Sequence, residues 1–343
     1  MDKAITDGLI PFAKATQVER VASHTYKANL SDTFCIGTVP NGGYVASCIL
    51  EAAGLHLAER GQRDVLNAHF QFLNRTEIGP AIVIIEDVKL GRQLSTLHVT
   101  LYQHALLPTA PWITQGSTRK EIAGYLTMTN LKKESGISLP TGFTLQHSAP
   151  ALPRPDFAAL KENRDANWIR YEFPGGSPLS YARCLRNCIY YDPRGGRTTK
   201  SVLDKWVRLA SGENFTAASL GYVADCWPYV VEAQRPTKKE AAELQSRGEI
   251  LPFAPGATFW YPTVVLNLEI KKALPEEGLE WLQMRVQSKQ IKDGRFDLEV
   301  LLLDENGDLV ALSNHVNLIL GSERNTADRT RSGDAAKKSL SRI

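Results

Sequence analysis

The sequence has few cysteines, and their spacing excludes the usual cysteine-based frameworks. Only five of the 343 residues are cysteine, at scattered positions: Cys35, Cys48, Cys184, Cys188 and Cys226. This odd number does not suit a disulfide-stapled secreted domain and favours reduced thiols in an intracellular protein. The closest pair is spaced C-x3-C, with no second pair to complete a set of four zinc ligands. We therefore predict no metal site, and no motif indicates a cofactor.

Long apolar runs and a strong excess of one charge are also missing. The apolar stretches are shorter than the roughly 20 residues that a membrane helix needs. The N-terminus, MDKAITDGLIPFAKAT, contains Asp2 and Asp7 and has no continuous apolar segment, unlike a secretory signal. With 40 basic and 37 acidic residues, the net charge of +3 gives no reason to expect nucleic acid or an anionic membrane as a partner. These absences predict a soluble, intracellular, cytoplasmic protein without a membrane span.

The C-terminal tripeptide leaves a second compartment open. Ser341, Arg342 and Ile343 follow the small, basic, aliphatic order of the S-K-L peroxisomal address. The charged segment from about residue 323 onward would leave this tripeptide accessible. Peroxisomal import is therefore an alternative to the cytoplasm.

The first half of the chain contains a helix followed by several strands. Asn41-Gly42-Gly43 precedes YVASCILEAAGLHLAER, where apolar residues recur at helical spacing. Strand-like runs follow: VLNAHFQFLN, GPAIVIIEDVKLG, LSTLHVTLYQH and residues 123–131. A helix and a long antiparallel meander indicate a sheet wrapped around one helix.

The second half repeats this order, which with the length predicts two domains. SVLDKWVRLA is a lead strand, NFTAASLGYVADCWPYVVEA has helical spacing as far as Val230, and four strand candidates follow up to NHVNLIL. Pro- and Gly-rich segments between the halves predict an irregular linker, whose aromatic residues should pack on the domains. The predicted division is residues 1–135 for the first unit, 136–200 for the linker, 201–322 for the second unit and 323–343 for a flexible charged tail.

Asp225 is the residue most able to perform chemistry. It lies in the apolar run SLGYVADCWPYVV, where an ionised carboxylate is costly unless it is paired or its pKa is raised. A raised pKa would suit a general base working near neutral pH. The structural alternative places Asp225 on an exposed helix edge, or as a cap on the turn before Pro228.

Thr263 and His315 are weaker candidates by themselves. Thr263 opens the strand TVVLNLEI, where a threonine is ordinary, and His315 in ALSNHVNLIL is either a hydrogen-bonded structural residue or a proton carrier facing a carboxylate. The sequence contains no G-x-S-x-G elbow, no H-E-x-x-H and no P-loop. These absences exclude the nucleophilic-serine, zinc-protease and nucleotide-binding motifs.

These three residues fall on a known pattern. Over most of residues 20–320 the chain resembles the double-hotdog acyl-CoA thioesterases (type II, thioesterase-like superfamily). PNGGYVASCILEAA looks like the family's Gly-Gly-led central helix, and AHFQFLNRTEIGP and GRQLSTLHVTLYQ look like two of its strands. LGYVAD, PTVVLNLEI and LVALSNH are similar to the segments with the catalytic aspartate, the water-holding threonine and a catalytic glutamine. The resemblance implies an α+β fold, a tandem (double) hotdog of two antiparallel sheets each wrapped around a central helix.

The resemblance also implies hydrolysis of an acyl-CoA or carrier-bound acyl thioester. Asp225 would act as general base on water, with Thr263 and His315 positioning that water. Backbone N–H groups at a helix N-terminus would stabilise the oxyanion. Gly42 and Gly43 would shape the substrate tunnel or the first-half counterpart of the site. The expected partner is the acyl substrate, and a homo-oligomer is left open because two fused hotdogs already close each other's sheet edges.

One position departs from the family. His315 stands where the family has glutamine, and a histidine is shorter and can titrate. One alternative is therefore another acyl-thioester enzyme of this fold, a hydratase or a polyketide-tailoring enzyme, although the D-x-N-P-x-H-type run of the hydratases is absent. The other is a non-catalytic acyl-binding protein in which the histidine has silenced the site.

Overall fold

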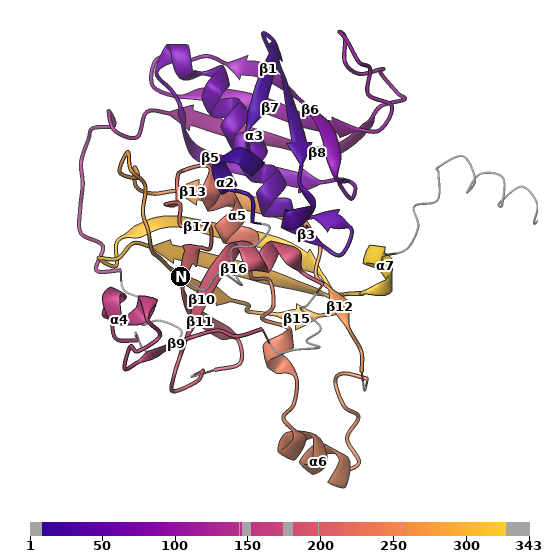
Figure 1. Cartoon of the computed structure of the whole chain (residues 1–343), viewed down its shortest axis with the longest axis vertical. Coiled ribbons are helices and arrows are strands. Elements are labelled where there is room, and N and C mark those ends of the chain that lie inside the picture. Colours follow the sequence, from indigo (N-terminus) through magenta and orange to yellow (C-terminus); the bar gives the residue numbers. More distant parts are fainter. Residues whose placement is uncertain are drawn as a thin grey trace, which may run out of the picture.

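The chain forms two similar halves, each with a helix packed against a curved antiparallel sheet (Figure 1). The structure is a computed structural model that describes residues 9–143, 145, 152–173, 181–197, 199–254 and 256–326. The helix-then-meander order predicted for both halves is confirmed.

The N-terminal half places helix α3 (Gly42–His56) against six strands. Asn41 caps this helix, because its side-chain oxygen accepts the N–H of Tyr44 at 3.0 Å. Apolar residues such as Val45 and Ile49 are fully buried. The strands are β1 (Val18–Ala22), β2 (Thr25–Leu30), β5 (Asp64–Phe72), β6 (Gly79–Lys89), β7 (Ser95–Gln103) and β8 (Arg119–Thr129), adjacent in the order β1-β2-β6-β7-β8-β5.

The C-terminal half packs the shorter helix α5 (Ser219–Asp225) against seven strands. Burial alternates along its last long strand, so that Ser313, His315 and Asn317 all face the interior. The strands are β9 (Trp168–Arg170), β10 (Cys188–Pro193), β11 (Val202–Leu209), β13 (Thr263–Ile270), β14 (Leu282–Gln287), β16 (Arg295–Leu303) and β17 (Leu309–Leu318), in the order β13-β17-β16-β14-β11-β10-β9.

Shorter elements connect these parts. They are α2 (Phe12–Ala15), η1 (Asp32–Phe34), β3 (Cys35–Ile36), β4 (Val39–Pro40), η2 (Ala58–Arg60), α4 (Phe157–Lys161), η4 (Arg183–Asn187), η5 (Glu232–Gln234), α6 (Lys238–Ser246), β12 (Phe259–Trp260), β15 (Ile291–Lys292), β18 (Leu320–Gly321) and α7 (Glu323–Thr326). The segment that contains α6 projects away from the rest of the molecule (Figure 1).

The two half-sheets join along the seam between β5 and β13. These strands pair antiparallel, with Phe70 opposite Leu266, and a bond of 2.7 Å between His69 Nδ1 and Asn267 Oδ1 crosses the seam. The result is one continuous 14-stranded sheet. Each half therefore covers a strand edge that the other would otherwise expose.

Helices α3 and α5 pack against each other between the halves. Helix α5 ends at Asp225, although the apolar spacing predicts a helix as far as Val230. Pro228 explains the difference, since a proline disfavours helical dihedrals at the residue before it. The carboxylate of Asp225 is thus at the end of a short helix.

The segment predicted as an irregular linker contributes two strands. Residues 168–170 and 188–193 form β9 and β10 and extend the C-terminal sheet beyond β11. Trp168 is fully buried and packs beside Trp206. The prolines and glycines around these strands dominate the sequence pattern, and three to six residues are too few to show a clear period.

The first residues of the segment predicted as a flexible tail form a helix. Glu323–Thr326 form helix α7, in which Asn325 is fully buried and its side-chain oxygen accepts the N–H of Thr38 at 3.1 Å. The tripeptide Ser341–Ile343 lies outside the described residues. None of the helices in the described ranges has the length and apolar character needed to cross a membrane. All five cysteines are free and buried.

Candidate active site

The carboxylate of Asp225 lies where the two halves meet. Its side chain is only 4% exposed, which places it away from an exposed helix edge. Its Oδ2 atom accepts the backbone N–H of Gly43 at 2.8 Å and the side-chain N–H of Asn41 at 3.2 Å. Both donors belong to the start of α3 in the other half, and a helix N-terminus favours a negative charge. Asn41 therefore caps its own helix and binds the carboxylate.

Thr263 holds the second carboxylate oxygen. Its hydroxyl donates to Oδ1 of Asp225 at 2.7 Å. The same hydroxyl accepts a hydrogen bond from the side-chain amide of Asn317, at 2.9 Å. Because Asn317 is fully buried and supplies the donor, the Thr263 proton is directed at the carboxylate.

His315 lies behind the carboxylate. Its Nδ1 atom is 3.4 Å from Oδ1 of Asp225, within ion-pair range but without an aligned hydrogen bond. Its other ring nitrogen bonds to the hydroxyl of Ser313 at 2.6 Å. The His315 side chain has no exposed surface, so it contacts Asp225 from the interior.

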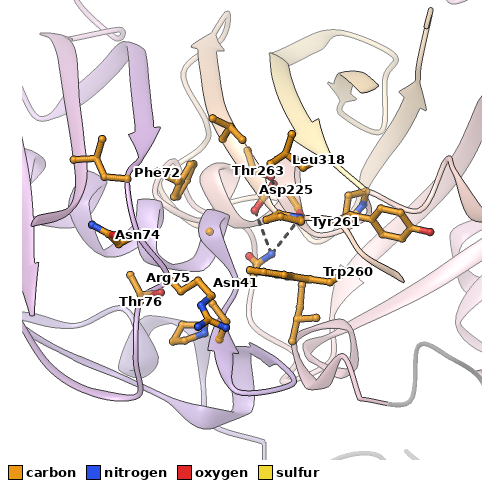
Figure 2. Close-up of a pocket in the computed structure, with 18 residues that line it drawn as sticks. Asn41, Phe72, Asn74, Arg75, Thr76, Asp225, Trp260, Tyr261, Thr263 and Leu318 are labelled. Atoms are coloured by element: carbon orange, nitrogen blue, oxygen red, sulfur yellow. Dashed lines mark hydrogen bonds between the residues drawn. The ribbon is translucent and has the colours of Figure 1, made fainter. Parts of the chain in front are cut away.

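A cavity of about 220 Å³ opens in front of Asp225 (Figure 2). The N-terminal half lines it with Asn41, Gly42 and Phe72, among others. The C-terminal half contributes residues that include Trp260 and Leu318, together with Asp225 and Thr263. His315 is not part of this lining. The cavity combines a largely apolar wall with one carboxylate, which suits a ligand with an apolar group beside a polar reacting centre.

Glycine at position 43 allows helices α3 and α5 to pack closely against each other. A Cβ atom there would lie 2.4 Å from the backbone oxygen of Gly221 and 2.6 Å from Cβ of Asp225. Gly42 is less crowded, although an added Cβ would meet the Phe72 ring at 3.0 Å. The Gly-Gly pair thus shapes the site, and Gly43 also donates to the carboxylate.

Nearby thiols do not supply a nucleophile. Burial is the main reason that the pKa of the Cys226 thiol is raised to about 12, and the neighbouring charge of Asp225 acts in the same direction. Burial likewise raises the pKa of the Cys184 thiol well above its ordinary value. Both thiols stay protonated near neutral pH, so neither is a thiolate nucleophile.

Family models match both halves of the chain. A model of the acyl-CoA thioesterase N-terminal domain matches residues 30–118, and a model of the acyl-CoA thioesterase C-terminal domain matches residues 147–319. The thioesterase-like protein TwmA of Talaromyces wortmannii is 48% identical over 336 residues, which cover 95% of this chain and 96% of TwmA. The chain belongs to the acyl-CoA thioesterase family.

Solved structures are similar over nearly the whole length of this thioesterase-family chain. A conserved protein with a hot dog fold from Alicyclobacillus acidocaldarius gives a TM-score of 0.64 at 16% identity, covering 91% of this chain and 98% of the other. The acyl-CoA thioesterase II TesB2 of Mycobacterium marinum gives a TM-score of 0.58 at 18% identity, covering 94% and 100%. The tandem hotdog fold implied by the resemblance is therefore confirmed.

Asp225, Thr263 and His315 lie together in the structure of this family member. Two residues that hydrogen-bond to them were not predicted from the sequence. Asn41 and Asn317 bond directly to Asp225 and Thr263, from positions far away in the sequence. No local pattern distinguishes them from ordinary turn and strand residues. Only a fold that brings residues 41, 225 and 317 together identifies them.

The sequence contains a short internal repeat that could have indicated the contact between α3 and α5. Residues 43–48 read GYVASC and residues 221–226 read GYVADC. In the structure, Asp225 accepts the N–H of Gly43 on α3, and Ser47 accepts the N–H of Tyr222 on α5 at 3.0 Å. Ser47 is therefore the first-half counterpart of Asp225, and the two helices exchange nearly equivalent hydrogen bonds.

Proposed function

We propose that this protein hydrolyses acyl-CoA or carrier-bound acyl thioesters, with Asp225 as the general base that activates water. The supporting observation is a buried carboxylate, fixed by donors from both halves, that lines a largely apolar cavity. Membership of the acyl-CoA thioesterase family supports the thioester as the substrate class.

In the proposed reaction, the carboxylate of Asp225 takes a proton from a water molecule in the cavity. The water oxygen bonds to the thioester carbonyl carbon and forms a tetrahedral intermediate. This intermediate collapses with cleavage of the carbon–sulfur bond, and the leaving thiolate takes up the proton that Asp225 removed from the water, which restores the carboxylate. Thr263 fixes the carboxylate by donating to Oδ1, so that the proton-accepting group keeps one orientation.

The start of α3 is suited to hold the developing oxyanion. Gly42 is the first residue of the helix and lines the cavity, and its N–H has no intrahelical acceptor. Among the described residues, this N–H donates to no other acceptor. A donor of this kind contributes about 3–4 kcal/mol to an acyl-transfer transition state. The adjacent Gly43 N–H is already committed to Asp225.

We assign His315 a positioning role rather than direct contact with water. Its side chain is sealed from the cavity and faces Oδ1 of Asp225. A histidine at this place packs against the carboxylate, with Nδ1 3.4 Å from Oδ1, and so limits the orientations open to Asp225. This role accounts for a working site despite the departure from the family at this position.

Replacing Asp225 by asparagine tests the proposal. General-base assistance contributes about 10²–10⁴ in rate, so D225N should lose kcat by about that factor on a panel of acyl-CoA thioesters assayed with a thiol reagent. D165N is the matched control, because Asp165 is 5% exposed and also accepts backbone N–H groups, but it does not line the cavity. Undiminished turnover in folded D225N would remove Asp225 from the mechanism.

A non-catalytic acyl-binding function is the second candidate. It is favoured by the low exposure of Asp225 and by the donors that already occupy both of its carboxylate oxygens. In that case the wild-type protein would bind a non-hydrolysable acyl-CoA thioether at equilibrium but release no thiol from the panel. A gain of thiol release in His315→Gln would then identify the histidine as the silencing change.

A further inference from the structure

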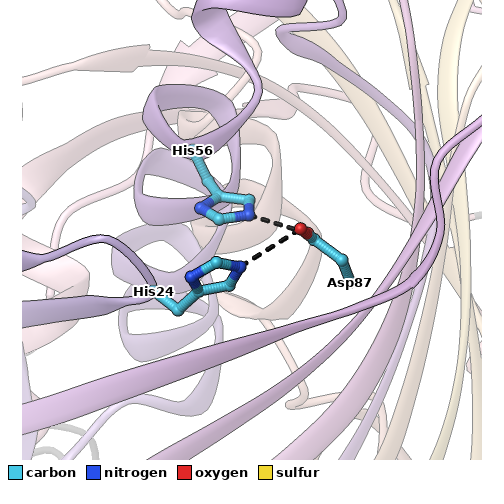
Figure 3. A group of neighbouring side chains, drawn as sticks. All are labelled: His24, His56 and Asp87. Atoms are coloured by element: carbon cyan, nitrogen blue, oxygen red, sulfur yellow. Dashed lines mark hydrogen bonds and ion pairs between the residues drawn. The ribbon is translucent and has the colours of Figure 1, made fainter.

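A second cluster of chemically active side chains lies at the other end of helix α3 (Figure 3). His56 is the last residue of α3, Asp87 is on β6, and His24 is in the turn between β1 and β2. Helix α3 has 15 residues, which at 1.5 Å per residue separate its ends by about 20 Å. The cluster is therefore separate from the cavity at Asp225.

Both histidines point their Nε2 atoms at the carboxylate of Asp87. Nε2 of His56 lies 2.8 Å from Oδ1 of Asp87, and Nε2 of His24 lies 3.1 Å from Oδ2. The three ligand atoms all lie within 4.8 Å of one another. A tetrahedral zinc ion about 2.1 Å from each of its ligands holds those atoms roughly 3.4 Å apart. The two nitrogen–oxygen distances of 2.8 and 3.1 Å are slightly shorter than this separation.

The opposite ring nitrogens have oxygen partners of their own. Nδ1 of His24 is 3.0 Å from the hydroxyl of Ser23, and Nδ1 of His56 is 3.3 Å from the hydroxyl of Tyr26. Histidines that bind metals generally use the second nitrogen in this way, which fixes the ring and leaves the first nitrogen's lone pair for the ion. Tyr26 is fully buried, so its hydroxyl is a fixed partner.

The main chain also holds the cluster in place. The carbonyl oxygen of His24 accepts the N–H of Ile85 at 2.9 Å, which ties the turn to β6 two residues before Asp87. Exposure decreases from 46% for the His24 side chain to 26% for Asp87 and 6% for His56. An ion could thus enter from the His24 side and meet a nearly buried ligand on the other.

We propose that His24, His56 and Asp87 form a binding site for a divalent transition-metal ion of the Zn²⁺ type. Two imidazoles and one carboxylate are nitrogen and oxygen donors that suit Zn²⁺ or Co²⁺ better than Mg²⁺ or Ca²⁺. Three protein ligands leave a fourth position for water. The ion would join the β1–β2 turn, the end of α3 and β6. The sequence gives no hint of this site, because the ligands are separated by about 30 residues each.

A second cluster of histidine and carboxylates in the N-terminal half is less suited to bind a metal ion. His104 also faces carboxylates, with Nε2 3.1 Å from Glu77 and 3.5 Å from Glu121. There, however, the guanidinium of Arg119 lies 2.6 Å from the same nitrogen. A fixed cation in that place repels a metal ion. The His24–His56–Asp87 cluster has no cationic side chain hydrogen-bonded to its ligand atoms among the described residues.

Metal titration of the full-length chain without a histidine tag tests the proposal. Zn²⁺ binding followed by calorimetry should reach one equivalent, and Co²⁺ should give the visible absorption of a four- or five-coordinate ion. Loss of an outer-shell partner costs about 10–100-fold in metal affinity, so D87N and His24→Ala, which each lose a direct ligand, should bind at least tenfold more weakly. Zn²⁺ should also raise the melting temperature of the wild type more than that of D87N.

His98→Ala is the matched control, because His98 pairs with a single carboxylate, Glu86, on the same sheet. It should bind Zn²⁺ as the wild type does. Melting curves in a chelator separate loss of a ligand from damage to the fold, and His24→Ala is the safer variant because His24 is the most exposed of the three ligands. No stoichiometric binding by the wild type, or equal affinity in D87N, His24→Ala and His98→Ala, would overturn the proposal.

Discussion

Asn317 supplies a side-chain amide to the site from the same face of β17 as His315. Residues 315 and 317 both point inward because side chains alternate along a strand. Asn317 donates to the hydroxyl of Thr263, which in turn donates to Asp225. An amide is therefore present near the carboxylate even though position 315 is a histidine. We regard Asn317 as a positioning residue for the proposed reaction, since it acts through Thr263.

Removal of this amide should lower kcat more than it changes KM. A hydrogen bond of about 1 kcal/mol corresponds to a fivefold effect, so Asn317→Ala should reduce kcat about five- to tenfold on acyl-CoA thioesters. Asn314→Ala is the control, because Asn314 is exposed on the opposite face of the same strand. An equal loss in both variants, or a change in KM alone, would contradict the positioning role.

Single residues could be predicted from the sequence only where their local setting was unusual. Asp225 is conspicuous because a carboxylate interrupts an apolar run, and the resemblance added Thr263 and His315. The structure places these three side chains together, while their catalytic roles stay predictions. Asn41 and Asn317 occupy ordinary polar positions, so their contacts depend on tertiary structure and were not predictable.

At the scale of elements, the crossing of α3 and α5 determines where the carboxylate lies. Gly43 provides both the close approach and one of the donors to Asp225. Any side chain at this position must separate the helices or displace Asp225. The geometry of the site therefore depends on how two helices pack.

The variant Gly43→Ala tests this dependence. Overpacking of a tight contact typically costs about 1–3 kcal/mol, so the free energy of unfolding should fall by that amount in a denaturant titration, and thioester hydrolysis should be lost. Gly195→Ala should leave both unchanged, because an added Cβ there meets nothing within 4 Å. Full activity in Gly43→Ala would mean that the helices can separate without moving Asp225.

Elements were predictable where they were long. The central helix of the first half and the long strands of both meanders have clear periods, and the structure contains them. Strands β9 and β10 are short and lie among prolines and glycines, and α5 is cut short before Pro228. In each of these cases a local backbone constraint or a tertiary pairing outweighs the apolar pattern.

At the scale of the whole molecule, the β5–β13 seam makes one sheet out of two halves. The seam, the α3–α5 contact and the hydrogen bonds of Asp225 all connect the halves. An isolated half would expose a strand edge and the apolar faces of the helix contact. The halves therefore depend on each other for their stability.

We expect the halves to unfold together. Five of the six tryptophans belong to the C-terminal half, from Trp168 onward, so tryptophan fluorescence mainly reports on that half. Far-UV circular dichroism reports on both halves. The two signals should change at the same denaturant concentration, as expected for a single cooperative transition. Separate midpoints would show that one half folds independently of the seam.

The equivalence of Ser47 and Asp225 in the internal repeat leaves each chain with one carboxylate at the α3–α5 contact. The repeat gives the molecule two related positions, but only one of them holds a group that can accept a proton near neutral pH. The serine hydroxyl at the other position accepts the N–H of Tyr222 and is not a base near neutral pH. For the proposed hydrolysis, titration with a tight-binding substrate analogue should thus count one site per chain, although the chain contains two copies of the fold.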